Sequence, residues 1–177
     1  MNQMPRSLVH VVDDNSAIRD LMAALMNKFG YDVLSFPDAQ SYLEYLNSDQ
    51  FVEPLVTFVD VIMPNMNGYE MIAAIAPEHQ GMKFIIMSAE SDIRSEYKHL
   101  ACMFLKKPFH IESIEEVLSQ MEACRVCGPS NDLDCDAVDQ RAYYQLSDWS
   151  CPNATDIQLV PSAEPLLNKR LSDYLHY

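Results

Sequence analysis

The chain of 177 residues is long enough for one ordinary domain with its own hydrophobic core and an additional segment of a few dozen residues. Its composition, 49% hydrophobic and 21% charged with four glycines, excludes collagen-like and largely disordered proteins. The formal net charge of −14 argues against nucleic-acid binding, because phosphate backbones repel an acidic chain and no cluster of Lys and Arg exceeds a pair.

Membrane and disulfide features are also missing from the sequence. No apolar window approaches the length of a membrane span or a secretory signal core, so we expect a cytoplasmic protein without membrane insertion. The five cysteines are an odd number, and Cys102 lies inside an apolar segment, which does not fit a secreted disulfide framework. Reduced thiols and a metal site are the remaining interpretations of the cysteines.

Apolar runs alternate with helical patterns from the amino terminus onward. The run Leu8 to Val12 is typical of a buried strand, and a helical repeat follows it as far as Phe29, before Gly30 ends the helix. Residues 32–36 form a second predicted strand, and Asp38 is the predicted N-cap of a second helix. The apolar positions of that helix are Tyr42, Leu43, Tyr45 and Leu46.

Three further strands are predicted at residues 54–60, 83–88 and 102–106. A short helix follows Gly68, and a fourth helix is expected from residue 92 to about residue 100, with Ser91 as its cap. A fifth helix follows Pro108. The apolar positions of the third and fifth helices are Met71, Ile72, Ile75, Ile111, Ile114, Val117, Leu118 and Met121.

Five strand-then-helix units in a row predict an α/β fold, a doubly wound five-stranded parallel sheet with helices on both faces. Parallel strands need crossover connections, and those crossovers cover the sheet. In such sheets ligands bind beyond the carboxyl ends of the strands. The polar residues expected there are Asp13, Asp14, Asp60, Ser88 and Lys107.

These residue types suit phosphoryl transfer. Carboxylates held close together repel one another, so we expect a cation among them, and hard oxygen ligands suit Mg²⁺. A carboxylate can act as the nucleophile that accepts a phosphoryl group, while an ammonium and a hydroxyl can pair with the phosphoryl oxygens. Such a transfer relies mainly on positioning and charge neutralisation.

Four motifs resemble the receiver domain of bacterial two-component response regulators, which is a CheY-like, flavodoxin-like fold. They are VVDDN, VDVIMPNMNG, MSAE and LKKPF, and they follow the family's order over roughly residues 7 to 123. The resemblance implies a receiver domain at residues 1–123 and an acidic, cysteine-containing extension at residues 124–177 without a recognised effector domain.

The resemblance also implies a role for each matching position. Asp60 is similar to the phosphoacceptor; Asp14, Asp60 and the backbone carbonyl of Ile62 should bind Mg²⁺ directly, and Asp13 through water. Ser88 resembles the switch hydroxyl, and Phe104 the aromatic that follows it inward. Lys107 should pair with the phosphoryl group, and a cis Lys107–Pro108 bond is usual in the family.

Several of these residues also have a simpler structural interpretation. Asp13 can cap the first helix together with its neighbours Asn15 and Ser16, and Asp60 alone would be a turn residue. Phe104 fits an ordinary core position, and Lys106 is a rival to Lys107. The choice of Lys107 rests on its place before Pro108.

The sequence departs from the family pattern at a few places. The span from Ser88 to Lys107 is shorter than is typical by roughly one helical turn, which concerns the fourth helix and its output face. Ile62 and Glu90 occupy positions that in the family influence how water attacks the acyl phosphate. We hypothesise that apolar Ile62 gives no help to an attacking water and so favours a long-lived phosphoryl group.

Residues 124–177 show no sustained apolar period and carry eight acidic against four basic residues. Their cysteines allow a Zn²⁺ site with four thiolates, although the favoured interpretation is reduced thiols in a docking or partly disordered tail. These cysteines are Cys124, Cys127, Cys135 and Cys151. A closing amphipathic helix is predicted around Leu166, Leu167, Leu171 and Tyr174.

Four function classes follow from these patterns. The leading one is a signalling switch: a histidine kinase or phosphotransfer protein phosphorylates Asp60, and the altered surface binds a downstream protein. Such a switch catalyses only its own phosphorylation and dephosphorylation. The alternatives are a non-signalling scaffold acting through its tail, an aspartyl-phosphate phosphatase related to haloacid dehalogenases, whose nucleophile motif D-x-D is not matched, and a transcription factor, for which a basic domain is missing.

Overall fold

The computed structural model describes residues 6–79, 81–89 and 100–126. Its centre is one five-stranded sheet in the order β2-β1-β3-β4-β5, with every neighbouring pair parallel. The strands are β1 (Leu8–Val12), β2 (Asp32–Phe36), β3 (Val56–Asp60), β4 (Phe84–Ser88) and β5 (Met103–Lys106). The predicted five-stranded parallel sheet is confirmed.

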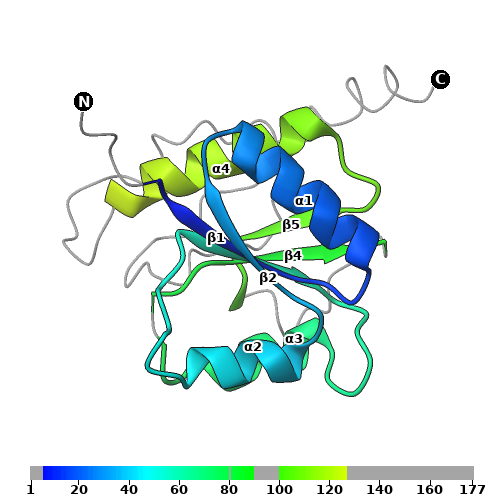
Figure 1. Ribbon diagram of the computed structural model, residues 1–177, viewed down its shortest axis with the longest axis vertical. Coiled ribbons are helices and arrows are strands. Elements are labelled where there is room, and N and C mark those ends of the chain that lie inside the picture. The colour runs from blue at the N-terminus through cyan, green and yellow to red at the C-terminus, as the bar shows by residue number, and fades with distance from the viewer. Residues whose placement is uncertain (1–5, 80, 90–99, 127–177) are drawn as a thin grey trace, which may run out of the picture.

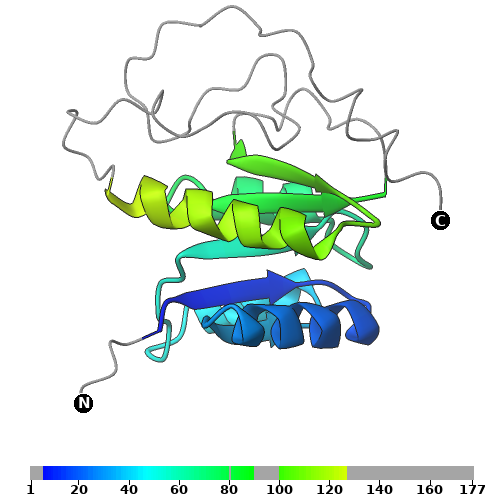
Figure 2. The same ribbon diagram turned by 90° about the horizontal axis from the view of Figure 1, so that it is seen from above.

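Helices cover both faces of this sheet, as predicted (Figure 1). Helices α1 (Ser16–Lys28) and α4 (Ile111–Val126) lie on one face, and α2 (Ala39–Leu46) and α3 (Gly68–Ile75) lie on the other. Figure 2 looks onto the sheet from the side of α1 and α4, which lie in front of the strands. Each layer encloses its own apolar cluster, because alternate residues of every strand point to opposite faces.

The central strands differ from the edge strands in burial. Every residue of β3 and β4 is buried, and in β1 only the first residue is partly exposed. Strands covered on both faces read as continuous apolar runs, which is why the sequence revealed them clearly. The edge strand β2 has three exposed residues, Asp32, Leu34 and Ser35.

The strand boundaries agree closely with the prediction: β4 and β5 each begin one residue later than predicted, and the largest shift is at β3. Strand β3 begins at Val56, two residues later than predicted, because Pro54 has no N–H to donate to a strand ladder. The predicted fifth helix is α4, and it continues three residues beyond the predicted domain boundary at residue 123. Within the described residues, none of the helices has the length and apolarity needed to cross a membrane.

Some predictions concern residues outside those described. They include the fourth helix at residues 92–100 with its cap Ser91, the closing helix and most of the extension. Of the four zinc-candidate cysteines, Cys124 lies on the last turns of α4, and the other three fall in residues 127–177. The zinc site, the extension and its boundary therefore stay predictions.

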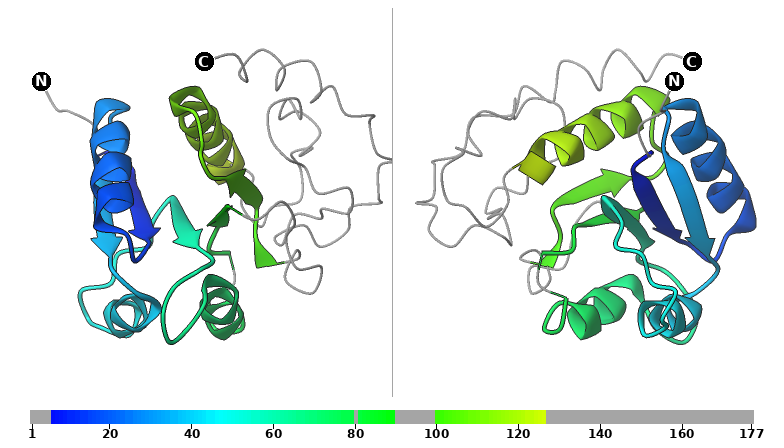
Figure 3. Two further views of the ribbon diagram at one scale, coloured as in Figure 1. Left: turned by 90° about the vertical axis from the view of Figure 1, so that its right-hand side faces the viewer. Right: turned by 60° about the vertical axis from the view of Figure 1, so that its left-hand side comes forward.

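The strand order determines where a ligand can reach the sheet. The connection that leaves β1 leads to β2 on one side, whereas the connection that leaves β3 leads to β4 on the other side, so the strand order reverses between β1 and β3. A crevice opens at such a reversal, outside the carboxyl ends of the strands. Figure 3 shows β1 and β3 side by side at this point, between the two helical layers.

Candidate functional site

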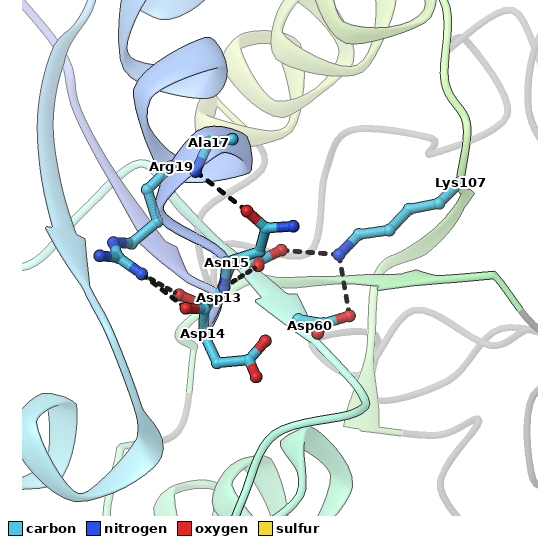
Figure 4. A network of polar contacts seen from close by, with 7 residues as sticks. All are labelled: Asp13, Asp14, Asn15, Ala17, Arg19, Asp60 and Lys107. Atoms are coloured by element: carbon cyan, nitrogen blue, oxygen red, sulfur yellow. Dashed lines mark hydrogen bonds and ion pairs between the residues drawn. The ribbon is translucent and has the colours of Figure 1, made fainter.

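Side chains from three strand ends meet at the carboxyl edge of the sheet. Asp13 directly follows β1, Asp60 is the last residue of β3, and Lys107 directly follows β5. The Lys107 Nζ atom lies 2.6 Å from Oδ2 of Asp13 and 3.0 Å from Oδ1 of Asp60 (Figure 4). The ammonium therefore bridges two carboxylates that belong to neighbouring central strands.

A third carboxylate completes an acidic cluster. One oxygen from each of Asp13, Asp14 and Asp60 lies within 4.8 Å of the other two. Asp13 and Asp60 are buried, whereas Asp14 is exposed, so the cluster is closed on the side of the core and open to solvent on the other. Three converging carboxylates with one open side are a donor set that fits Mg²⁺, which prefers oxygen ligands and retains several waters.

The charges in this cluster are only partly balanced. Burial raises the pKa of Asp60, the Lys107 ammonium opposes that rise, and the charges of Asp13 and Asp14 add to it. Burial acts to lower the pKa of Lys107, but its hydrogen bonds to the two buried carboxylates outweigh that effect, so the net shift is upward. One lysine therefore does not compensate three carboxylates, and an added cation would relieve the repulsion.

In the loop between β1 and α1, different residues cap the helix and form the acidic cluster. Asn15 is the N-cap of α1, and its side chain accepts a hydrogen bond from the backbone N–H of Ala17 at 3.0 Å. Asp13 instead accepts the N–H of Asn15 on Oδ1, at 2.9 Å. The cap that was an alternative role for Asp13 is thus supplied by Asn15, which leaves both neighbouring carboxylates at the edge of the sheet.

The loop after Asp60 is held at both ends. The N–H of Val61 donates to the carbonyl of Met87 on β4, and the N–H of Gly68 donates back to the carbonyl of Val61. Helix α3 then starts with a capping box, in which Asn67 and Glu70 satisfy each other's backbone N–H groups. These contacts fix both ends of the loop that connects Asp60 to α3.

Ser88 and Phe104 lie on one face of the sheet, next to the cluster. Ser88 ends β4 and is 1% exposed, and its carbonyl accepts the N–H of Lys107 at 2.7 Å. Phe104 pairs with Ile86 across β4 and β5, two residues before Ser88, so both side chains point towards the α2 and α3 layer. Phe104 is buried there, as a core aromatic would be.

Ile62, the bond before Pro108 and Glu90 are the remaining predicted features of the site. Ile62, two residues after Asp60, is 60% exposed, and the role of its carbonyl stays a prediction. The Lys107–Pro108 bond is cis, as expected, and Lys107 rather than Lys106 directs its ammonium into the cluster. Glu90 lies outside the described residues.

Sequence reasoning missed Arg19, which contacts the same loop. The Arg19 Nη1 atom donates to the backbone carbonyls of Asp13 and Asp14, at 2.8 Å and 3.1 Å (Figure 4). A weak signal was available, since an arginine one turn into the helix that follows two aspartates can reach back over the loop. A helical arginine of this kind is usually interpreted as a solvated side chain, and nothing in the local pattern contradicts that interpretation.

Comparisons with known proteins agree with this geometry. Residues 9–119 match the family model described as "Response regulator receiver domain". The chain is 32% identical over 143 residues to the DNA-binding transcriptional regulator NtrC of Escherichia coli K12, an alignment that covers 73% of this chain and 30% of that protein. It is 31% identical over 121 residues to the two-component response regulator ARR10 of Arabidopsis thaliana, covering 66% of this chain and 22% of that one. The chain thus spans less than a third of either relative.

Solved structures give the same result. The chemotaxis response regulator CheY4 of Vibrio cholerae superposes with a TM-score of 0.60 at 25% identity, covering 66% of this chain and 99% of that one. Full-length FixJ from B. japonicum superposes with a TM-score of 0.60 at 26% identity, covering 68% of this chain and 60% of that one. The family match, the strand order and the acidic cluster agree, and the chain belongs to the response regulator receiver domains of two-component systems.

Proposed function

We propose that Asp60 accepts a phosphoryl group from a phosphohistidine of a sensor kinase or phosphotransfer protein. The observation that carries this proposal is the contact of the Lys107 ammonium with Asp60, inside a cluster of three carboxylates at the reversal point of the sheet. In the transfer, an Asp60 oxygen forms a bond to phosphorus while the P–N bond to the donor breaks. The imidazole nitrogen keeps the electron pair of that bond.

The acidic cluster fits a bound Mg²⁺. Asp14, Asp60 and the carbonyl of Ile62 would hold the ion directly and Asp13 through water, and the ion would neutralise charge on the phosphoryl oxygens. Lys107 already lies at hydrogen-bond distance from Asp60, so its ammonium can transfer from the carboxylate to a phosphoryl oxygen with little movement. Its pairing with Asp13 keeps it in place while Asp60 changes charge.

The output of this switch would be a changed affinity for a protein. Ser88 would move to bind the phosphoryl group and Phe104 would follow it, since both side chains lie on the same face of adjacent strands. The chain would then act as a phosphoacceptor switch in the cytoplasm rather than as an enzyme with a substrate of its own. The DNA binding named for the NtrC relatives belongs to proteins of which this chain covers less than a third, and the charge of −14 favours a protein partner.

Intact-mass measurement tests the proposal. Wild-type protein incubated with acetyl phosphate and Mg²⁺ is expected to gain one phosphoryl group, while Asp60→Asn is expected to gain none. Asp20→Asn is the matched control, because it removes an exposed carboxylate on α1 without touching the cluster. An adduct that persists in Asp60→Asn would refute the assignment of Asp60, and a wild type that neither acetyl phosphate nor a phosphohistidine donor modifies would favour the scaffold.

The lifetime of the adduct gives a second prediction at this site. The apolar Ile62 side chain is 60% exposed beside Asp60 and offers no hydrogen bond to an attacking water. Ile62→Asn is therefore expected to shorten the half-life of the phosphorylated protein several-fold, which loss of the adduct after removal of the donor would measure. Rapid decay in the wild type that Ile62→Asn does not accelerate would contradict this role.

A further inference from the structure

Arg19 is tied to the backbone of the acidic loop rather than to its carboxylates. Its Nη1 atom donates to the carbonyl oxygen of Asp13 at 2.8 Å and to that of Asp14 at 3.1 Å (Figure 4). One guanidinium nitrogen with two hydrogens thereby holds two successive peptide units. Side chains on a helix lean towards its amino terminus, so residue 19 can reach the loop that precedes α1.

The other polar atoms of Asp13 are already held. Its N–H donates to the carbonyl of Phe36, Oδ1 accepts the N–H of Asn15, and Oδ2 accepts the Lys107 ammonium. The carboxylate of Asp14 is different, because it is exposed at the open side of the cluster. Its direction depends on the peptide units before and after it, whose oxygens are the two that Arg19 binds.

The charge of Arg19 and its hydrogen bonds have opposite expected effects on the affinity of the cluster for a cation. A guanidinium bound to the backbone of the acidic loop repels any cation that binds in the cluster, so its charge alone would weaken cation binding. The charge of Arg19 also acts on Asp38. The pKa of Asp38 is lowered mainly by hydrogen bonds from Ser41, and the Arg19 charge makes a smaller contribution. Positioning and charge therefore predict opposite effects of removing this side chain, and an experiment can separate them.

We infer that Arg19 is a positioning residue: by fixing the peptide units of Asp13 and Asp14 it holds the Asp14 carboxylate in the cluster and raises divalent-cation affinity despite its own charge. This inference rests on the proposed function of the cluster as a cation site. Groups that orient metal ligands from outside the coordination shell typically change affinity about 10-fold to 100-fold.

The test is a titration of the full chain with Mn²⁺, followed by the electron paramagnetic resonance signal of the free ion. Arg19→Gln is expected to weaken Mn²⁺ binding about tenfold, because it loses both carbonyl contacts. Arg19→Lys keeps the charge but presents a single ammonium instead of a planar fork, so an intermediate affinity is expected. Arg6→Gln is the matched control, since Arg6 pairs at 3.8 Å with Asp32 on an exposed edge, and we expect its affinity to equal that of wild type.

A second measurement separates positioning from general destabilisation. Each variant is titrated at a temperature at which its circular dichroism spectrum is that of the folded protein. Saturating Mn²⁺ should then restore the rate of adduct formation with acetyl phosphate in Arg19→Gln, because the defect lies in cation affinity. Restoration would support the inference, and a slow rate at saturation would overturn it.

The other outcomes are equally decisive. Equal or tighter Mn²⁺ binding by Arg19→Gln would show that the charge of Arg19 dominates, and would overturn the positioning role while leaving the cation site intact. A wild type that binds no Mn²⁺ would overturn the proposed cation site, and the role of Arg19 with it.

Discussion

Replacing His10 by phenylalanine is expected to remove a large part of the pH dependence of stability between pH 6.5 and pH 4. Wild-type protein should lose about 3 kcal/mol of its free energy of unfolding across this window relative to His10→Phe. Urea unfolding at a series of pH values, with the difference between the two proteins plotted against pH, measures the effect. The difference cancels the contributions of carboxylates that titrate in the same range.

The reason is the complete burial of an imidazole. His10 is 0% exposed in the middle of β1, and the rings of Phe36, Tyr42, Tyr45 and Phe51 surround it with centroid distances of 5.6 to 6.3 Å. Burial lowers its pKa from 6.5 to about 4. Between these values the unfolded chain binds a proton that the folded chain rejects. The contribution of His10 to stability is therefore fully present above pH 6.5 and is lost as the pH decreases towards 4.

Tyr42→Phe distinguishes burial from hydrogen bonding as the cause. The Tyr42 hydroxyl lies 3.2 Å from His10 Nδ1 and 3.0 Å from Thr57 Oγ1, whereas His10 Nε2 has no hydrogen-bond partner. We expect Tyr42→Phe to lower the free energy of unfolding by about 1 kcal/mol at every pH and to keep the slope. If Tyr42→Phe abolished the pH dependence of the free energy of unfolding, or if His10→Phe retained it, burial of His10 would not be the cause of that dependence. If a phenylalanine at residue 10 prevents folding, His10→Gln replaces it in the comparison, because glutamine does not titrate.

Much of the fold could be predicted because its signals are local and repeated. Each buried strand is a continuous apolar run, and the run ends at a polar residue where the chain leaves the core, as Val56 to Asp60 does. Parallel strands point the same way, so residues that follow different strands, such as Asp13 and Lys107, lie at the same edge of the sheet, where a long side chain can join them. The location of the cluster was therefore predictable before any distance was known.

Other features depend on contacts that no local pattern encodes. His10 occupies a strand position that reads like its apolar neighbours, and only the surrounding rings reveal a buried imidazole. Arg19 reads as an exposed helical residue, although its guanidinium binds the acidic loop. In the loop between Asp60 and α3 the positive φ belongs to Asn65, with φ of 68°, and not to Gly68. The glycine is needed for a different reason.

The carbonyl of Asp60 lies against the place that a side chain at residue 68 would occupy. A Cβ atom on Gly68 would be 2.3 Å from the Asp60 carbonyl oxygen and 2.8 Å from Cγ1 of Val59. The first of these is a backbone atom at the end of a central strand, so it cannot turn aside as a long side chain can. The start of α3 is thus packed directly on the backbone of the proposed phosphoacceptor.

Gly68→Ala is therefore expected to destabilise the protein by about 3 kcal/mol, because the overlap must displace either α3 or the end of β3. A loss of stability would be informative, since alanine inside a helix is otherwise favoured over glycine by about 1 kcal/mol. We also expect slower adduct formation with acetyl phosphate, because a shift of the Asp60 backbone changes the position of its carboxylate relative to Lys107. Urea unfolding and the initial rate of the mass increase measure the two effects.

Gly30→Ala is the matched control for this change. Gly30 has φ of 91°, and a Cβ atom there would meet no other atom within 4 Å, so alanine should cost roughly 1 kcal/mol of backbone strain and leave the phosphorylation rate unchanged. The two substitutions add the same methyl group, one against the Asp60 backbone and one into open space. Equal losses of stability with equal phosphorylation rates would mean that the Asp60 backbone accommodates the methyl group, and that α3 does not determine where the carboxylate lies. Slow phosphorylation of Gly68→Ala together with an unchanged phosphorylation rate of Gly30→Ala would show that packing of α3 on β3 positions the site.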